Sequence, residues 1–472
     1  MFQLQDIPPV TWVDTPEAMM NFVRHVKDTK ESSLDTETTG LSRWKDHVII
    51  WSACPDLRTR YCFSRDMLRI YDAELSQDRN IRWYLTNETF DFCMLKNSGV
   101  RVPVGDAYDT LAMDWFYDEN RFGSHGLKET AKDHCGLGMT SYKDTFVAAH
   151  AKESPQERLM RGLKEDFAGA IGYASYDAYA TLRVYKKLRS FLRKQYSTGD
   201  MCLWDYFKEV EMPFTRVLYN MISRGIMVDV GHLQTLSPQL AHEEEEIHRK
   251  IIKIAGKEIN TRSVQQMRWL LFDKLGLKPV KMTKGGESGK KAPSTDEEVL
   301  THYADKGVEV CGLVLKLRKV GKIRGTYVDG LQKWVDPEGR IHPTLTQHIT
   351  VTGRISSVDP NLMNIPQADG DEYHLRRAFI ARPGYKLLVR DYSQIEMRLL
   401  AHMANERNMI DVINRGWDIH VGTASLMFGH AYEAIKAAVK KKKSGETLSD
   451  EEMEMVFARQ ASKTIGFGRP VC

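Results

Sequence analysis

Apolar and polar residues alternate with two different periods in the first two hundred residues. Residues 41–55 and 59–64 contain apolar runs of strand length, whereas residues 18–29 and 180–195 carry apolar positions at the spacing of a helix face. Short strands mixed with helices are typical of α/β domains. We therefore predict an α/β domain that ends near residues 197–199.

The pattern becomes mostly helical from residue 204 to about residue 331. Within it, residues 212–225 and 242–256 have apolar residues at helical spacing. Residues 339–366 are extended and rich in turn-forming residues, and the pattern then predicts a strand at residues 386–389 and a helix at residues 394–404. The predicted fold class is α/β followed by α+β in a multidomain chain.

Composition narrows the class of protein. The chain has 472 residues, of which 42% are hydrophobic and 28% charged, which is the balance of a globular protein with about three domains. The formal net charge is only +4, so any nucleic-acid-binding surface must come from the patterning of charge. Seven scattered cysteines without a CxxC pair argue against a zinc site and for a reducing compartment. No apolar run approaches the ~20 residues of a membrane span, and we expect a cytoplasmic protein with no membrane partner.

Asp35 and Glu37 stand two residues apart in the segment SLDTETTGL. Side chains two apart in a strand point to the same side, so the two carboxylates face one side together. Neighbouring carboxylates repel each other unless a cation lies between them. A solvated strand edge is the alternative interpretation of this pair.

Two further segments place a polar side chain one helical turn from an aspartate. They are NETFD at residues 87–91 and YASYD at residues 173–177. Gathered in one cleft, the four carboxylates of the three segments would hold two divalent ions, which activate water and stabilise an in-line displacement at phosphorus. Tyr173 would lie on the same helix face as Asp177 and orient that water.

These three segments resemble, in order and spacing, the DxE, NxxxD and YxxxD motifs of the DEDD 3′–5′ exonucleases. The resemblance covers about the first 195 residues and includes HGLKETA at residues 125–131. It implies an RNase H-like domain that removes nucleotides from the 3′ ends of single-stranded DNA with two Mg²⁺ or Mn²⁺ ions. The implied catalytic residues are Asp35, Glu37, Asp91, Tyr173 and Asp177, of which the four carboxylates would bind the ions. Leu41 would contact the terminal base, and a place in the core is the alternative for it.

The second half contains two segments with unusual chemistry. Residues 352–366 (TGRISSVDPNLMNIP) offer many hydrogen-bond donors, which suit DNA phosphates and the minor groove. Their chemistry alone favours the alternative, an ordinary polar loop. Asp391 follows the apolar run of residues 386–389, and Glu396 lies on the next helical turn. A carboxylate at a strand end is a common position for a metal ligand, and a helix cap is the alternative for Asp391.

At these segments the chain closely resembles the family A DNA polymerases of the bacterial polymerase I type. Residues 352–366 are similar to TGRLSSxxPNLQNIP of that family, with Met363 in place of the usual glutamine, and residues 389–404 are similar to its motif A. Residues 418–428 match its DIHxxTAxxxF stretch, and residues 459–468 resemble the start of motif B.

The resemblance implies a domain order and residue roles. The implied domains are a 3′–5′ exonuclease (1–198), a helical thumb (199–331), the first part of the palm (332–415) and the start of the fingers (416–472). Asp391 and the carbonyl of Tyr392 would bind catalytic ions, and Glu396 would exclude a ribose 2′-hydroxyl. Other residues implied to contact the deoxynucleoside triphosphate are Gln394, His420, Arg459, Lys463 and Phe467. Those implied to contact primer–template DNA are Arg354, Asn361 and Asn364.

The family A pattern is incomplete at its end. After residue 468 the sequence continues as RPVC, in which Pro470 would break the helix of motif B and Val471 stands where the family has a tyrosine. In addition, the His-Asp of motif C does not follow. Because nucleotide addition needs both palm carboxylates, we expect the chain to keep exonuclease activity and DNA binding without synthesis. A separate C-terminal polymerase fragment is then a candidate partner. Truncation, frameshift, intron and intein all remain open as the cause.

Three functions stay open from the sequence. They are a proofreading family A DNA polymerase of phage or bacterial type that acts in DNA replication, a freestanding DEDD-type exonuclease, and a non-catalytic primer–template-binding remnant. The polymerase motifs argue against the second, and the intact exonuclease residues argue against the third. We expect the bacterial host cytoplasm as the location if the chain is phage-encoded.

Overall fold

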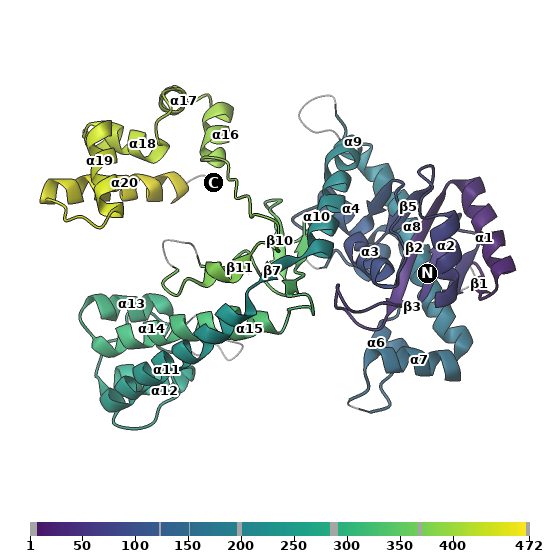
Figure 1. Ribbon diagram of the computed structural model, residues 1–472, viewed down its shortest axis with the longest axis horizontal. Coiled ribbons are helices and arrows are strands. Elements are labelled where there is room, and N and C mark those ends of the chain that lie inside the picture. The colour runs from purple at the N-terminus through teal and green to yellow at the C-terminus, as the bar shows by residue number, and fades with distance from the viewer. Residues whose placement is uncertain are drawn as a thin grey trace. The chain divides into compact units, whose positions relative to one another are not determined.

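The computed structural model describes residues 7–121, 124–150, 152–195, 201–283, 291–366 and 371–468. The chain divides into two compact units, Met1–Tyr385 and Lys386–Cys472, and the expected palm range has residues in both (Figure 1). The predicted fold class is confirmed, with an α/β domain first and a mixed α and β region after it. Among the described residues, no helix combines the length and the apolar character needed to cross a bilayer.

A six-stranded mixed sheet organises the first part of the first unit. Its strands are β1 (Val10–Val13), β2 (Glu31–Thr38), β3 (Val48–Cys54), β4 (Arg60–Ser64), β5 (Arg82–Leu85) and β6 (Ala107–Asp109). The strand order is β1-β4-β3-β2-β5-β6. Strand β3 runs antiparallel to both β2 and β4, whereas the other neighbouring pairs are parallel. Strand β2 is therefore central, and the strand-edge interpretation of Asp35 and Glu37 is wrong.

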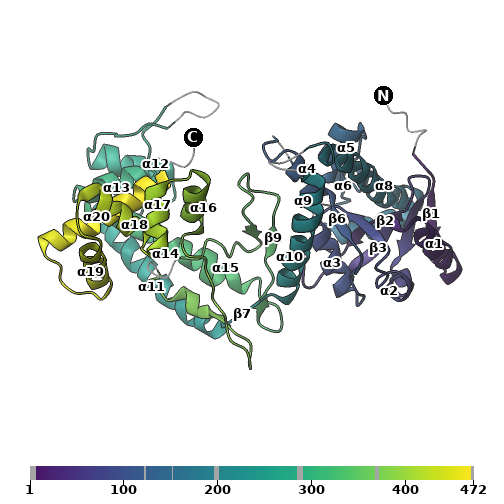
Figure 2. The ribbon, with the colours of Figure 1, turned by 90° about the horizontal axis from the view of Figure 1, so that it is seen from above.

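Helices cover both faces of this sheet. One face carries α1 (Pro16–Thr29), α2 (Leu68–Glu74), which follows the short helix η2 (Arg65–Met67), and α3 (Glu88–Asn97). The other carries α4 (Thr110–Tyr117), α5 (Leu127–Cys135), α6 (Tyr142–Thr145), α7 (Pro155–Glu165) and the long α8 (Phe167–Leu192). Figure 2 shows α4, α5 and α8 above the sheet and α2 and α3 below it. Successive side chains of β3 point alternately to these two layers. Trp51 packs in the core on the α1 face, whereas Ser52 Oγ donates a hydrogen bond to the Ala174 carbonyl of α8 at 2.8 Å.

The strand predicted over residues 41–55 begins only at Val48. Residues before it form a turn that the carboxylate of Asp46 holds closed. The Ser42 amide donates to Asp46 Oδ2 at 2.7 Å, and Thr39 Oγ1 donates to Asp46 Oδ1 at 2.9 Å. An aspartate that satisfies nearby backbone donors favours a turn over a strand, which the apolar pattern alone did not reveal.

The rest of the first unit is mostly helical up to Gln332, as predicted for residues 204–331. Its helices are α9 (Leu203–Tyr206), η3 (Phe207–Glu211), α10 (Met212–Arg224), α11 (Val230–Ala255), α12 (Val264–Arg268), η4 (Trp269–Lys274), α13 (Glu297–Asp305), α14 (Glu309–Lys322), η5 (Ile323–Val328) and α15 (Asp329–Gln332). A buried apolar stripe runs along α11 through Leu233, Leu240, Ile247 and Ile251. This stripe packs α11 against α14 in one core.

Two small sheets follow along the chain. Strand β7 (Ile226–Val228) pairs with β8 (Arg340–Ile341) and β11 (Phe379–Ile380), which the short helix η7 (Leu375–Ala378) precedes. Strands β9 (Thr344–Thr346) and β10 (Ser356–Val358) form an antiparallel pair. Leu345 of β9 is buried in the same core as α1 and α3, so this pair is docked on the α/β domain.

The second unit is helical. It contains α16 (Ile395–Met403), α17 (Arg407–Asn414), α18 (Ile419–Phe428), α19 (Tyr432–Lys443) and α20 (Asp450–Gly468). The strand predicted at residues 386–389 does not form, and Leu388 and Val389 are 79% and 84% exposed. A strand needs a neighbour to pair its backbone groups, and residues 386–389 are in no sheet among those the structure describes.

Candidate active site

Strand β2 delivers Asp35 and Glu37 to the face that α8 covers. Ser33, two residues before Asp35, donates a hydrogen bond through Oγ to the Ala178 carbonyl of α8 at 2.6 Å. Leu34 points the opposite way into the core beneath α1. Because side chains alternate along a strand, Asp35 and Glu37 share the α8 side with Ser33.

Helix α8 brings Asp177 to these two carboxylates. One oxygen from each of Asp35, Glu37 and Asp177 lies within 4.8 Å of the other two, and all three side chains are half-buried. The hydrogen bonds from Ser33 and Ser52 to the α8 backbone fix the helix against the sheet. Two of the three predicted acidic segments thus meet in one group of oxygen ligands.

The third predicted segment places Asp91 beside this group. Asp91 lies in the first turn of α3, and Thr36 Oγ1 donates a hydrogen bond to its Oδ1 at 2.6 Å. The carboxylate of Asp109 accepts from the amides of Asn87 and Glu88, both at 2.9 Å, and so anchors the start of α3. Asp91 approaches β2 from the side opposite α8 and is close enough to raise the pKa of both Asp35 and Glu37.

The electrostatics of this cluster favour a cation. Burial, and then the neighbouring carboxylates, raise the pKa of Glu37 to about 8 and that of Asp35 well above its usual range. Burial likewise raises the pKa of Asp177 to about 7 and that of Asp91 to about 8. Hard carboxylate oxygens gathered at this spacing fit Mg²⁺ or Mn²⁺, which would replace the protons.

Tyr173 lies one helical turn before Asp177 and borders the cluster. Burial, followed by the charges of Asp177, Glu37 and Asp35, raises the pKa of its phenol, so the hydroxyl remains protonated. The rings of Tyr142 and Phe146 pack edge-on against it, with centroids 6.1 Å and 5.3 Å away. Tyr173 is therefore held as a neutral hydrogen-bond donor next to the carboxylates.

Two further residues at this site were not predicted from the sequence. Lys128 of α5 is close enough to lower the pKa of Glu37 and Asp177, and its Nζ lies 5.9 Å from the centroid of the Tyr173 ring. Tyr142 contacts the same ring from α6. The HGLKETA segment, which contains Lys128, is the sequence signal that could have identified that residue. No feature of the sequence around Tyr142 indicated a place at this site. Leu41 is 84% exposed, so its alternative place in the core is wrong.

The residues predicted for polymerase chemistry are divided between the two units. Asp391, Tyr392 and Glu396 are exposed in the second unit near the start of α16. Gln394 occupies the N-cap position of that helix, so Asp391 is not the cap residue. The side chain of Gln394 accepts a hydrogen bond from the Ile419 amide of α18 at 3.3 Å. Arg354, Asn361 and Asn364 are exposed residues of the first unit.

Helices α18 and α20 bring part of the predicted nucleotide site together. Arg459 Nη2 lies 3.4 Å from Asp418 Oδ2, and Ser462 Oγ donates to the carbonyl of His420 at 2.7 Å. Lys463 follows Arg459 by one helical turn and is exposed. Phe467 is within α20, but its side chain, like Pro470 and Val471, lies outside the described residues.

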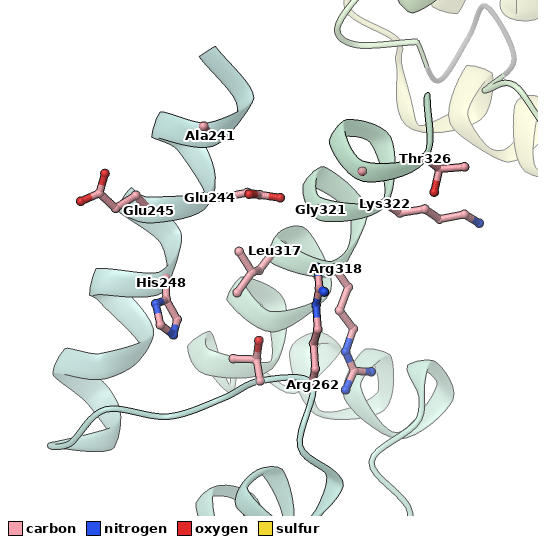
Figure 3. A pocket seen from close by; sticks show the side chains of 12 residues that line it. Ala241, Glu244, Glu245, His248, Arg262, Leu317, Arg318, Gly321, Lys322 and Thr326 are labelled. Atoms are coloured by element: carbon pink, nitrogen blue, oxygen red, sulfur yellow. The ribbon is translucent and has the colours of Figure 1, made fainter. Parts of the chain in front are cut away.

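A separate pocket of about 690 Å³ lies between α11 and α14. Figure 3 shows Glu244 reaching from α11 towards Gly321, and Arg262 rising from the loop between α11 and α12. Arg318 and Lys322 of α14 also line it, and none of the exonuclease carboxylates does. The pocket therefore has three cationic side chains and the two carboxylates of Glu244 and Glu245 in its lining, at a place distinct from the exonuclease carboxylates.

The two parts of the chain match two family models. Residues 10–193 match the model described as 3′-5′ exonuclease, and residues 230–444 match DNA polymerase family A. Residues 230–444 therefore belong to DNA polymerase family A, and residues 10–193 belong to the 3′–5′ exonuclease family. The family A match includes strands β8 to β11 and reaches into the second unit.

Known relatives agree with this membership. DNA polymerase I of Rhizobium leguminosarum is 34% identical over 78% of this chain and 34% of its own length. A thermostable DNA polymerase I of Thermus thermophilus is 36% identical over 71% of this chain and 37% of its own length. The chain thus spans little more than a third of these relatives. The solved POL domain of Pol1 from M. smegmatis, in complex with DNA primer-template and dNTP, matches this chain with a TM-score of 0.75. The match covers 98% of this chain and 71% of the solved chain. Because the two sequences are 22% identical, this likeness shows the fold.

Proposed function

We propose that this chain removes nucleotides from the 3′ ends of single-stranded DNA with the help of two divalent ions. The observation that carries the proposal is the convergence of Asp35, Glu37 and Asp177, with Asp91 beside them. The three acidic oxygens offer ligands for one ion, and Asp91 extends the ligand set towards a second. Ions bound there would activate water and stabilise the oxygens of an in-line displacement at phosphorus.

The chain's own residues would orient that reaction. The hydroxyl of Tyr173 stays protonated, so it would hold the attacking water by a hydrogen bond. Leu41, which is exposed, would pack against the terminal base. Lys128, the cation beside Glu37 and Asp177, would lie near the negative charge of the scissile phosphate.

The test is digestion of a single-stranded oligonucleotide with Mg²⁺ or Mn²⁺. The Asp35→Ala/Glu37→Ala double variant should be folded and inactive, because it loses two of the three clustered ligands. Asp28→Ala, which removes an exposed carboxylate on α1 at the other face of the sheet, is the matched control and should digest like the wild type. Wild-type rates from the double variant would show that the assigned site is wrong.

We further propose that the family A region binds primer–template DNA and deoxynucleoside triphosphates. Arg459 and Lys463 of α20 are both close enough to His420 of α18 to lower its pKa, and this gathering of cationic groups supports a triphosphate site. Asp391 and the Tyr392 carbonyl would hold its ions, and Glu396, Gln394 and Phe467 would contact the sugar and base. Arg354, Asn361 and Asn364 would contact the minor groove of the primer end.

The pocket between α11 and α14 supports duplex binding by the helical region. Arg262, Arg318 and Lys322 would contact DNA phosphates, so binding should weaken as salt rises. Arg318→Ala should weaken duplex binding for all sequences and reduce the salt slope by about one. Lys250→Ala, which removes an exposed cation of α11 outside this pocket, should change neither quantity.

A further inference from the structure

Arg43 is a buried cation that no predicted motif includes. It lies in the turn between β2 and β3 and is 9% exposed. In the described part of the chain no carboxylate forms an ion pair with its guanidinium, although a buried charge normally needs a partner. Its guanidinium instead donates hydrogen bonds to three neutral side chains on two different parts of the fold. Burial lowers the pKa of Arg43, and Cys93 and the carboxylates of Asp91 and Asp109 lie close enough to oppose that shift.

Two of these partners are at the start of α3. Arg43 Nη1 donates to Thr89 Oγ1 at 3.2 Å, and Nη2 donates to Asn87 Oδ1 at 3.4 Å. The guanidinium also lies 5.5 Å from the centroid of the Phe90 ring. These two hydrogen bonds and the ring contact hold the turn of backbone that leads directly into Asp91.

The third partner lies in the family A region. Arg43 Nε donates to Thr344 Oγ1 at 2.9 Å, and Thr344 is the first residue of β9. The neighbouring Leu345 is buried in a core that residues of α10 share with the α/β domain, so β9 is docked at this point. Strand β9 pairs with β10, which lies inside the expected primer-binding segment of residues 352–366.

We propose that Arg43 is a positioning residue of the exonuclease site that ties Asp91 to strand β9 of the polymerase region. The planar guanidinium has separate donors for Asn87, Thr89 and Thr344, so a shift of β9 would be transmitted to the first turn of α3. Asp91 would then take its working position only when β9 is docked. This inference rests on the proposed exonuclease function.

Thr344 and Thr346 give a matched pair for the test. Both are threonines of β9, but only the hydroxyl of Thr344 bonds Arg43. Thr346 Oγ1 is buried and has no hydrogen-bond partner among the residues that the structure describes. Thr344→Val should lower kcat on single-stranded DNA about tenfold, with KM unchanged, because small displacements of a catalytic group are costly. It should also raise the Mg²⁺ concentration needed for half-maximal rate. Thr346→Val should leave kcat, KM and the Mg²⁺ requirement unchanged.

Arg43→Met should lower kcat by about 10- to 100-fold. The Arg43→Met/Thr344→Val double variant should be no slower than Arg43→Met alone, because the hydroxyl then has no donor to lose. Melting temperatures of all four variants separate this effect from unfolding. The proposal would be overturned if Thr344→Val and Thr346→Val had equal kinetics. It would also be overturned if the loss of kcat in the double variant were the product of the losses in Arg43→Met and Thr344→Val. An inactive wild-type chain would instead refute the exonuclease function on which it rests.

Discussion

Glu88 provides a pH-dependent test of the buried carboxylates around α3. It is the first residue of that helix and is 1% exposed, and its Oε2 has no hydrogen-bond partner in the described part of the chain. Burial raises the pKa of Glu88 from 4.5 to about 8; the nearby Arg216 opposes this shift, and the charges of Asp109 and Asp91 add to it. Folding therefore requires Glu88 to stay protonated at a pH where the unfolded chain would release the proton.

The sign and size of the effect follow from this difference in pKa. Below pH 4.5 both states are protonated and Glu88 has no pH-dependent effect. Between pH 4.5 and about 8 only the unfolded state ionises, so the free energy of unfolding falls as pH rises, by about 1.4 kcal/mol per pH unit. From pH 5.5 to 7.5 the neutral variant Glu88→Gln should gain ~2–3 kcal/mol relative to the wild type.

Differential scanning calorimetry at pH 5.5 and 7.5 measures this change. The difference in melting temperature between Glu88→Gln and the wild type should grow by ~5–10 °C for a domain of this size. Glu17→Gln, which neutralises an exposed glutamate of α1, is the control and should show no such growth. If the difference for Glu88→Gln is the same at both pH values, Glu88 is not held protonated and the reasoning about burial fails.

Two further predictions concern the α/β domain. Asp114 is fully buried beside Arg121 and accepts hydrogen bonds from His125 Nδ1 at 2.7 Å and His134 Nε2 at 2.6 Å. Asp114→Ala leaves these groups without their partner, so it should lower the free energy of unfolding by about 3–5 kcal/mol. An unchanged midpoint of chemical denaturation would contradict this. Tyr173→Phe removes the hydroxyl while the metal ligands remain, so kcat for digestion should fall about 10- to 100-fold, less than in Asp35→Ala/Glu37→Ala. Equal losses in the two variants would assign Tyr173 a different role.

The acidic cluster could be predicted because its signals are local. The spacing of Asp35 and Glu37 on a strand, and of Tyr173 and Asp177 on a helix, each fixes a common face, and the order of the three segments allowed their convergence to be inferred. By contrast, Arg43 and Thr344 are 301 positions apart in the sequence, and only the folded chain shows their contact. Lys128 lies in the recognised HGLKETA segment, but its proposed role depends on its proximity to Glu37 and Asp177, which lie on other elements of the fold.

The errors in secondary structure have a common cause. The apolar pattern predicted strands at residues 41–55 and 386–389, but a pattern describes only which side chains are apolar. At the first place Asp46 satisfies backbone and hydroxyl donors and closes a turn. At the second no neighbouring strand among the described residues pairs with the segment, so its backbone does not form a ladder.

The polarity of digestion tests the central claim most directly. A single-stranded DNA oligonucleotide labelled at its 5′ end is incubated with the chain and Mg²⁺, and the products are resolved by length. We predict labelled fragments that shorten progressively from the 3′ end, none after chelation of the metal, and none with Asp35→Ala/Glu37→Ala. Release of the label as the first mononucleotide, or digestion that persists in the double variant, would contradict the assignment of the carboxylate cluster as a 3′–5′ exonuclease site.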